Sequence, residues 1–251
     1  MTATTDALRD AVQPPTDGDG GSRGLPGATC RTVGGVRVYT RDGQDWLSVS
    51  SVLRVMGLGR MPDGVKPEAI EYGRIRGVLV GDAAAIWVRA GRPLIDAPEG
   101  FALDGQVYPS FGAAMDAQVG PYLDAVVGTD PMARRPWSRF SLVPYLVGLE
   151  AACREHGWEP TETEVLCENE RLRVFGFVDL QCASTTRLEL KTSKTIRLAH
   201  RLQAGSYGAL VVRLGKGPAG MTTPTNEDGG RWDALVSCAH EWVREQDGRS
   251  R

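Results

Sequence analysis

The chain has 251 residues, of which 41% are hydrophobic and 24% are charged, and its formal net charge is -2 at pH 7. This length fits one large domain or at most two, and it allows a normal apolar core without disulfides or a structural metal. The near balance of 29 basic and 31 acidic residues excludes a histone-like polycation. It does not exclude a nucleic-acid partner, because a local basic strip is enough to bind phosphates.

Cysteine usage and hydropathy exclude several further classes. The five cysteines are odd in number and scattered, and none of them forms a C-x-x-C pair. This argues against a disulfide framework, a zinc site and an iron–sulfur cluster. No apolar run approaches the ~18–20 residues that span a bilayer, and the first residues do not resemble a signal peptide. We therefore expect a soluble, cytoplasmic protein with no membrane partner.

The composition divides the chain into a tail and a single domain. Residues 1–29 are rich in Thr, Asp, Gly and Pro, which predicts a disordered tail. Residues 30–251 are expected to form one domain, with a hairpin and helical part over 30–160 and a core over 161–251.

The first part of this domain is predicted to be mostly helical. Alternating residues over 36–40 and 46–49 predict a hairpin. Ser50 or Ser51 is expected to cap a short helix that stops at Gly57. Apolar spacing predicts three more helices, and a Pro- and Gly-rich stretch predicts a loop between the first two. The helices cover 67–90, 111–127 and 141–156, and the loop covers 92–110.

In the second part the hydrophobic period changes from that of a helix to that of a strand. Three strands are followed by a helix, a strand and a closing helix. Their predicted ranges are 163–168, 171–181, 187–192, 196–207, 209–214 and 232–245. Strands bracketed by helices indicate an α/β fold with a central mixed sheet flanked by helices.

Three charged residues on neighbouring predicted strands form the most informative pattern. Glu189 and Lys191 are two apart, so they point to the same face of their strand, and a hairpin can place Asp179 opposite them. Two converging carboxylates repel unless a cation lies between them, and a set of oxygen ligands favours Mg²⁺ or Mn²⁺. With a lysine beside it, such a site suits metal-assisted hydrolysis of a phosphodiester.

A bare E-x-K is more often a pair of ordinary charges on a solvated strand, and three neighbouring features favour a site instead. Gly176 precedes Asp179 on the same strand, where backbone can approach a ligand closely. Thr192 and Ser193 are small polar groups able to bind a phosphate. Two further residues, Gln203 and Tyr207, share one face of the following helix.

Several motifs in this region resemble those of the PD-(D/E)XK nuclease superfamily, in its RecB-like and phage exonuclease branch. The resemblance is specific over about residues 160–208 and looser over 46–160. Its motifs are Glu164 in TEVL, GFVD at 176–179, LELKTS at 188–193, and Gln203 to Tyr207 as Q-x-x-x-Y, with the serine-rich SVSSVL at 48–53 and Arg76-Gly77 in the looser part. Gly81, followed by Asp82, stands where RecB-like members place a histidine.

The resemblance implies a restriction-endonuclease-like fold and assigns roles to these residues. Asp179 and Glu189 would bind the divalent metal, helped by the carbonyl of Leu190. Lys191 would orient the attacking water or stabilise the developing charge. Glu164 would be a further metal ligand or a DNA contact. Gln203 and Tyr207 would support the site or touch DNA.

A basic cluster next to these residues is consistent with DNA as the partner. Lys194, Arg197 and Arg201 would share a helix face near the predicted site, where phosphates would run, although a solvated helix face is an equal alternative. Thr192 and Ser193 would add contacts to DNA.

We therefore expect a metal-dependent DNA nuclease, most simply an exonuclease of phage or bacterial recombination and repair. By the resemblance it would act on a free DNA end or with a helicase, some relatives work beside a single-strand-annealing protein, and some assemble as homo-oligomers. Two alternatives stay open. The first is a PD-(D/E)XK-fold module that binds nucleic acid without cutting it, and the second is a scaffold protein with an accidental E-x-K.

Overall fold

The computed structural model describes residues 24–58, 65–98, 100–103, 105–215 and 219–249. In this part of the chain the centre is a mixed sheet of eight strands. They are β1 (Thr29–Val33), β2 (Val36–Arg41), β3 (Gln44–Ser48), β6 (Pro160–Asn169), β7 (Val174–Cys182), β8 (Arg187–Lys191), β9 (Ala209–Arg213) and β10 (Gly220–Thr222). A separate hairpin consists of β4 (Phe101–Leu103) and β5 (Gln106–Tyr108).

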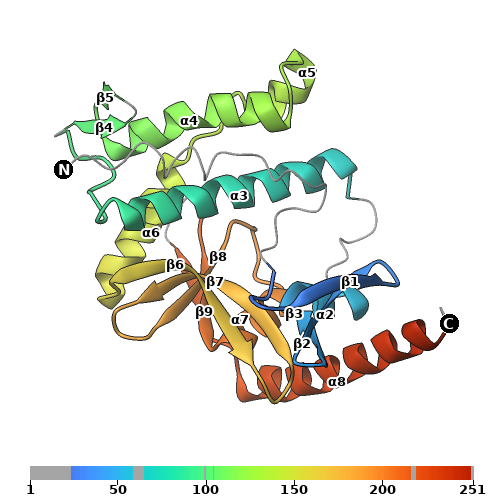
Figure 1. Ribbon diagram of the computed structural model, residues 1–251. Helices are drawn as coiled ribbons and strands as arrows, with labels where there is room; N and C mark the ends of the chain where they lie inside the picture. Colours follow the sequence, from blue (N-terminus) through green and yellow to red (C-terminus); the bar gives the residue numbers. More distant parts are fainter. Residues whose placement is uncertain (1–23, 59–64, 99, 104, 216–218, 250–251) are drawn as a thin grey trace.

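Helices cover both faces of the sheet (Figure 1). They are α2 (Val49–Val55), α3 (Pro67–Arg89), α4 (Phe111–Val126), α5 (Pro131–Arg134), the 3-10 turn η1 (Arg135–Trp137), α6 (Val143–His156), α7 (Leu198–Tyr207) and α8 (Asn226–Arg249). Figure 1 shows α3 between α4 and the sheet, with α7 and α8 on the opposite face. Apolar side chains form one large core with α3, α4 and α6 and a second core with α2, α7 and α8. No helix in these segments is long and apolar enough to cross a membrane.

The strand β7 lies at the centre of the sheet and has three partners. Antiparallel β6 pairs along its whole length, from Val174 to Cys182. Parallel β3 pairs only with the first two residues of β7, and antiparallel β8 pairs only with Leu180 and Gln181. Because a strand has two edges and β6 occupies one of them, β3 and β8 must share the other. They diverge along it, and this leaves a fork beside residues 176–179.

The side chains of β7 change face at this fork. Val178 packs in the core under α7 and α8, whereas Leu180 packs in the core under α3 and α6. Residues two apart on a regular strand share a face, so the alternation breaks at Asp179. On β6, Glu164 lies between Thr163 and Val165, which pair with Leu180 and Val178, and it has a left-handed φ of 53°. The backbone is thus irregular on both strands at the fork.

The mixed α/β architecture predicted from the sequence is confirmed, and most elements agree within a few residues. The cap of α2 differs: Ser48 accepts the N–H of Ser51, so neither Ser50 nor Ser51 is the cap. The helix α7 begins at Leu198 rather than near residue 196, and α8 is much longer than predicted.

Three parts of the fold were not anticipated. Most of the predicted tail lies outside the described residues, but Leu25 is buried against Tyr39 and Trp46, so residues 24–29 belong to the folded domain. The edge strands β1 and β10 have no strong alternation of their own and form by pairing with β2 and β9. The predicted loop 92–110 contains the β4–β5 hairpin.

Candidate active site

The fork in the sheet brings the predicted metal-binding residues together. Continued by one more pair, the register of β7 and β8 would set Asp179 opposite Glu189. The strands have separated there. The Asp179 carboxylate accepts a hydrogen bond from the N–H of Leu190 at 2.6 Å, in place of a backbone carbonyl of β7. The N–H and C=O of an extended residue point to the same edge of a strand. The carbonyl of Leu190 therefore also faces the fork.

Glu189 is a buried carboxylate with one unsatisfied oxygen. The residue is 1% exposed, and its Oε1 accepts a hydrogen bond from Lys191 Nζ at 2.6 Å. Its Oε2 has no hydrogen-bond partner among the described residues. A buried charge that lacks hydrogen-bond partners destabilises the folded protein. Such a group is therefore expected mainly where a ligand completes its pairing. The free oxygen of Glu189 is available to a ligand of the opposite charge.

The protonation of this group of residues is strongly perturbed. Burial, together with the charge of Glu189, raises the pKa of Asp179 from 3.8 to about 7. Burial lowers the pKa of Lys191, but the carboxylates of Glu189 and Asp179 outweigh it, so the net shift is upward. Lys191 therefore stays protonated. Ionisation of both Asp179 and Glu189 is unfavourable without a further cation.

The helix α7 forms one wall of the site. Tyr207 is buried and packs against β7, where a β-carbon at Gly176 would lie 2.6 Å from its ring atom Cε1. Burial and the charge of Glu189 raise the pKa of Tyr207 well above its ordinary value, while a hydrogen bond with Gln203 opposes the shift. The predicted Q-x-x-x-Y face thus does point toward the carboxylates.

A histidine on the same helix face was not singled out from the sequence as part of the site. His200 lies three residues before Gln203 and seven before Tyr207, which places the three on one side of α7. Its Nδ1 accepts the N–H of Arg197 at 3.2 Å. Burial and the charges of Lys191 and Arg197 lower its pKa to about 4, so the imidazole is neutral near pH 7. The spacing H-x-x-Q-x-x-x-Y was the signal that would have revealed it.

Glu164 lies at the rim of the same site. Its side chain is exposed, and its negative charge contributes to the raised pKa of Asp179. The predicted proximity of Glu164 and Asp179 therefore holds in the structure, but its carboxylate is more exposed to solvent than that of Glu189.

The helix α3 approaches the site from the other face. A β-carbon at Gly77 would lie 4.0 Å from the hydroxyl of Thr192, so the Arg76-Gly77 pair adjoins the end of β8. Gly81 has open space around the position of its missing side chain. Burial, together with the charge of the neighbouring Asp82, raises the pKa of Tyr122 on α4.

The predicted basic face is only partly formed. Lys194 is exposed but precedes α7, so it does not share a helix face with Arg197, which is the N-cap residue. Arg201 binds the buried carboxylate of Asp228 at 3.2 Å and thereby joins α7 to α8. Ser193 donates to the carbonyl of Thr195 within its own turn. Lys194 and Arg197 are thus the exposed basic residues of the set.

The residues at the fork fit a hard divalent cation, though with few side-chain ligands. Two carboxylates, one of which has a free buried oxygen, and the carbonyl of Leu190 form an all-oxygen set of the kind that Mg²⁺ and Mn²⁺ prefer. Among the described residues no three or more His, Cys, Asp or Glu side chains are grouped to hold a metal. Water or substrate oxygens would have to complete the coordination.

Comparison with models of known protein families gives no match to the chain, and comparison with the sequences of characterised proteins gives no significant match. The functional interpretation therefore depends on the geometry of the fork itself.

Proposed function

We propose that the protein is a divalent-metal-dependent DNA nuclease of the PD-(D/E)XK kind, with a restriction-endonuclease-like core. The observation that carries this proposal is the buried carboxylate of Glu189, whose free oxygen lies in the same fork as Asp179 and Lys191. A structural charge at this depth would be expected to have all its hydrogen bonds satisfied. An incompletely paired carboxylate beside a second carboxylate is the arrangement that a metal site requires.

Each residue has a distinct part in this proposal. Asp179, Glu189 and the carbonyl of Leu190 hold the cation, which supplies a Lewis acid for the phosphodiester and its attacking water. Lys191, kept protonated by the two carboxylates, holds that water or the developing negative charge. Tyr207, hydrogen-bonded to Gln203, packs against Gly176 and so fixes α7 against β7 beside the fork.

The reaction is tested on end-labelled linear DNA beside a closed circle, with Mg²⁺ and then Mn²⁺. We expect degradation of the linear DNA from its ends and little cutting of the circle, as for an exonuclease. Glu189→Gln retains the size of the side chain and removes its charge, so it should lose activity in both metals. Glu155→Gln, an exposed glutamate on α6, is the matched control and should behave as the wild type.

A nucleic-acid-binding module without cleavage is the second candidate. It is favoured by the small number of side-chain ligands and by Gly81, where the family pattern has a histidine. Binding of DNA with no cleavage in either metal would support the module and reject the nuclease. DNA is the proposed partner in both cases, and a helicase or a single-strand-annealing protein and assembly into a homo-oligomer stay part of the proposal.

A further inference from the structure

A polar cavity lies beyond the N-terminal end of β7, away from Asp179. It has a volume of about 250 Å³ and is formed by the β2–β3 turn, the β6–β7 turn and α8. Its lining is Gly43, Gln44, Asp45, Arg173, His240, Val243 and Arg244. Arg173 comes six residues before Asp179, and β7 is extended between them, so the cavity is about 20 Å from Asp179. It is therefore separate from the candidate active site.

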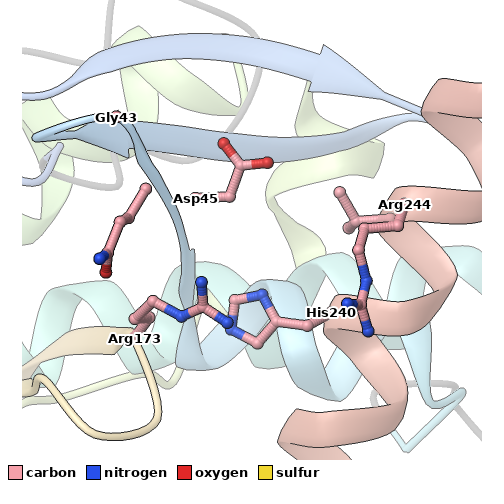
Figure 2. A pocket seen from close by; sticks show the side chains of 7 residues that line it. Gly43, Asp45, Arg173, His240 and Arg244 are labelled. Carbon is pink, nitrogen blue, oxygen red and sulfur yellow. The ribbon is translucent and has the colours of Figure 1, made fainter.

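Two arginines line this cavity. The guanidinium groups of Arg173 and Arg244 appear on either side of the His240 ring in Figure 2. No hydrogen bond or ion pair joins either of these guanidinium groups to the described residues; Arg173 is half-buried and Arg244 is exposed. The ordinary reason for holding a partly buried guanidinium without a protein partner is that a ligand supplies one.

The one carboxylate among the residues that line the cavity is paired with an arginine outside it. Asp45 accepts hydrogen bonds from both terminal nitrogens of Arg31, at 2.7 and 2.8 Å, and this contact holds its pKa below the ordinary value. Arg31 also binds Asp247 at 2.8 Å. These three charges sum to -1, and Arg173 and Arg244 add +2, so the charges at the cavity remain positive in total.

His240 holds this arrangement together. Its Nε2 lies 3.0 Å from the carbonyl of Leu172, and because a carbonyl only accepts, Nε2 carries the proton. The other ring nitrogen is then an acceptor when the imidazole is neutral, and a donor when it is protonated. Burial and the charge of Arg173 lower the pKa of His240, while its hydrogen bond to Leu172 and the charge of Asp45 oppose the shift. The ring thus joins α8 to the β6–β7 turn and fixes the spacing of the two arginines.

From this geometry we infer that the cavity binds a phosphate monoester dianion between Arg173 and Arg244. Two guanidinium groups match a charge of about -2, which a phosphate monoester approaches at pH 7, whereas a carboxylate or a phosphodiester carries a single charge. The volume is somewhat below the roughly 300–1,000 Å³ of drug-sized pockets and suits a phosphate with a small attached group. Gln44 at the rim can donate to a further phosphate oxygen.

Binding is measured by calorimetry and thermal melting in EDTA, so that the fork holds no metal and the two sites are tested separately. Inorganic phosphate and dAMP are the probes, with deoxyadenosine and a phosphodiester dinucleotide as negative controls. We expect both phosphates to bind and to raise the melting temperature, and neither control to do so. Similar affinities would identify a phosphate site, and a dAMP affinity ten times higher or more would identify a nucleotide site.

The variants decide whether the binding belongs to this cavity. Arg173→Gln with Arg244→Gln should weaken phosphate binding at least tenfold, while the exposed arginine variant Arg89→Gln should bind as the wild type does. If the double variant is unfolded at the temperature of the binding experiment, Arg244→Gln alone is used in its place. Asp45→Asn removes a negative charge and should bind phosphate at least as tightly.

The inference is overturned if the wild type binds no phosphate, if the phosphodiester binds as well as the monoester, or if Arg89→Gln weakens binding as much as the cavity variants. It does not depend on the proposed nuclease activity. If the protein binds phosphate in this cavity but cuts no DNA, the phosphate site is supported and the proposed nuclease function is rejected.

Discussion

The ring of Tyr207 occupies the space that a side chain at Gly176 would fill. A β-carbon there would lie 2.6 Å from the ring atom Cε1 and still closer to the hydroxyl. Two motif residues that are 31 positions apart in the sequence are thus in direct contact, and this contact fixes α7 against β7 beside the fork.

Gly176→Ala should therefore destabilise the protein by about 1–3 kcal/mol, the usual cost of forcing an extra group into a packed core. Urea unfolding measures the free energy change. In a Tyr207→Ala background the same substitution should cost much less, because the clash is absent. Gly81→Ala is the control: its β-carbon meets nothing, and helix propensity should raise stability by up to about 1 kcal/mol. Equal losses in both backgrounds would contradict the contact.

Lys191→Ala should reduce DNA cleavage by at least about 100-fold while changing the affinity for Mg²⁺ or Mn²⁺ little. A protonated lysine cannot be a metal ligand, and its removal leaves both carboxylates in place. Cleavage rates and calorimetric metal titration give the two measurements. Lys194→Ala, at an exposed lysine beyond β8, should retain the catalytic rate once DNA is saturating. A parallel loss of metal binding and cleavage in Lys191→Ala would argue against its assigned role.

Asp179 should make the stability of the metal-free protein depend on pH. Its pKa is raised from 3.8 to about 7, so its stabilising contribution is complete below about pH 4 and is lost as the pH rises through 7. Asp179→Asn removes this loss. The melting temperature of the variant relative to the wild type should rise between pH 5 and pH 8. Melting curves in EDTA at four pH values in this range check this, and parallel curves would rule it out.

The same shift should make metal binding pH-dependent. Because the metal binds the ionised carboxylate, protons compete with it below about pH 7, and affinity should fall by up to about tenfold per pH unit. Calorimetric titration with Mg²⁺ at pH 6 and pH 8 measures this. A constant affinity across that range would mean that Asp179 is not a ligand.

Glu164→Gly should separate stability from activity. A left-handed residue other than glycine costs about 1–2 kcal/mol, so glycine at φ 53° should stabilise the fold by roughly that order or less while removing a carboxylate near Asp179. We expect a higher unfolding midpoint and slower cleavage. Glu164→Gln keeps the backbone strain and should lose activity without the gain in stability. If glycine at 164 destabilises as much as Thr163→Gly does, strain at this residue is excluded.

Local signals in the sequence predicted most of the secondary structure. The alternation in β2 and β3, the apolar stripe of α3 and the change of period before β6 each depend on residues close in the chain, and the structure has these elements where they were expected. The cap of α2 was misplaced because Ser48, Ser50 and Ser51 are equally good caps. The end of β3 decides between them, and it depends on pairing with distant β7.

The sequence by itself determined which residues share a face: Glu189 and Lys191 on one side of a strand, and Gln203 and Tyr207 on one side of a helix. Only the tertiary structure decided how they meet. The fork arises because β3 and β8 share one edge of β7, and the change of face at Asp179, the contact of Tyr207 with Gly176 and the Arg173–Arg244 cavity all join segments far apart in the chain. Hydrophobic periodicity is a property of neighbouring residues, whereas convergence of side chains depends on which strands pair and where they part.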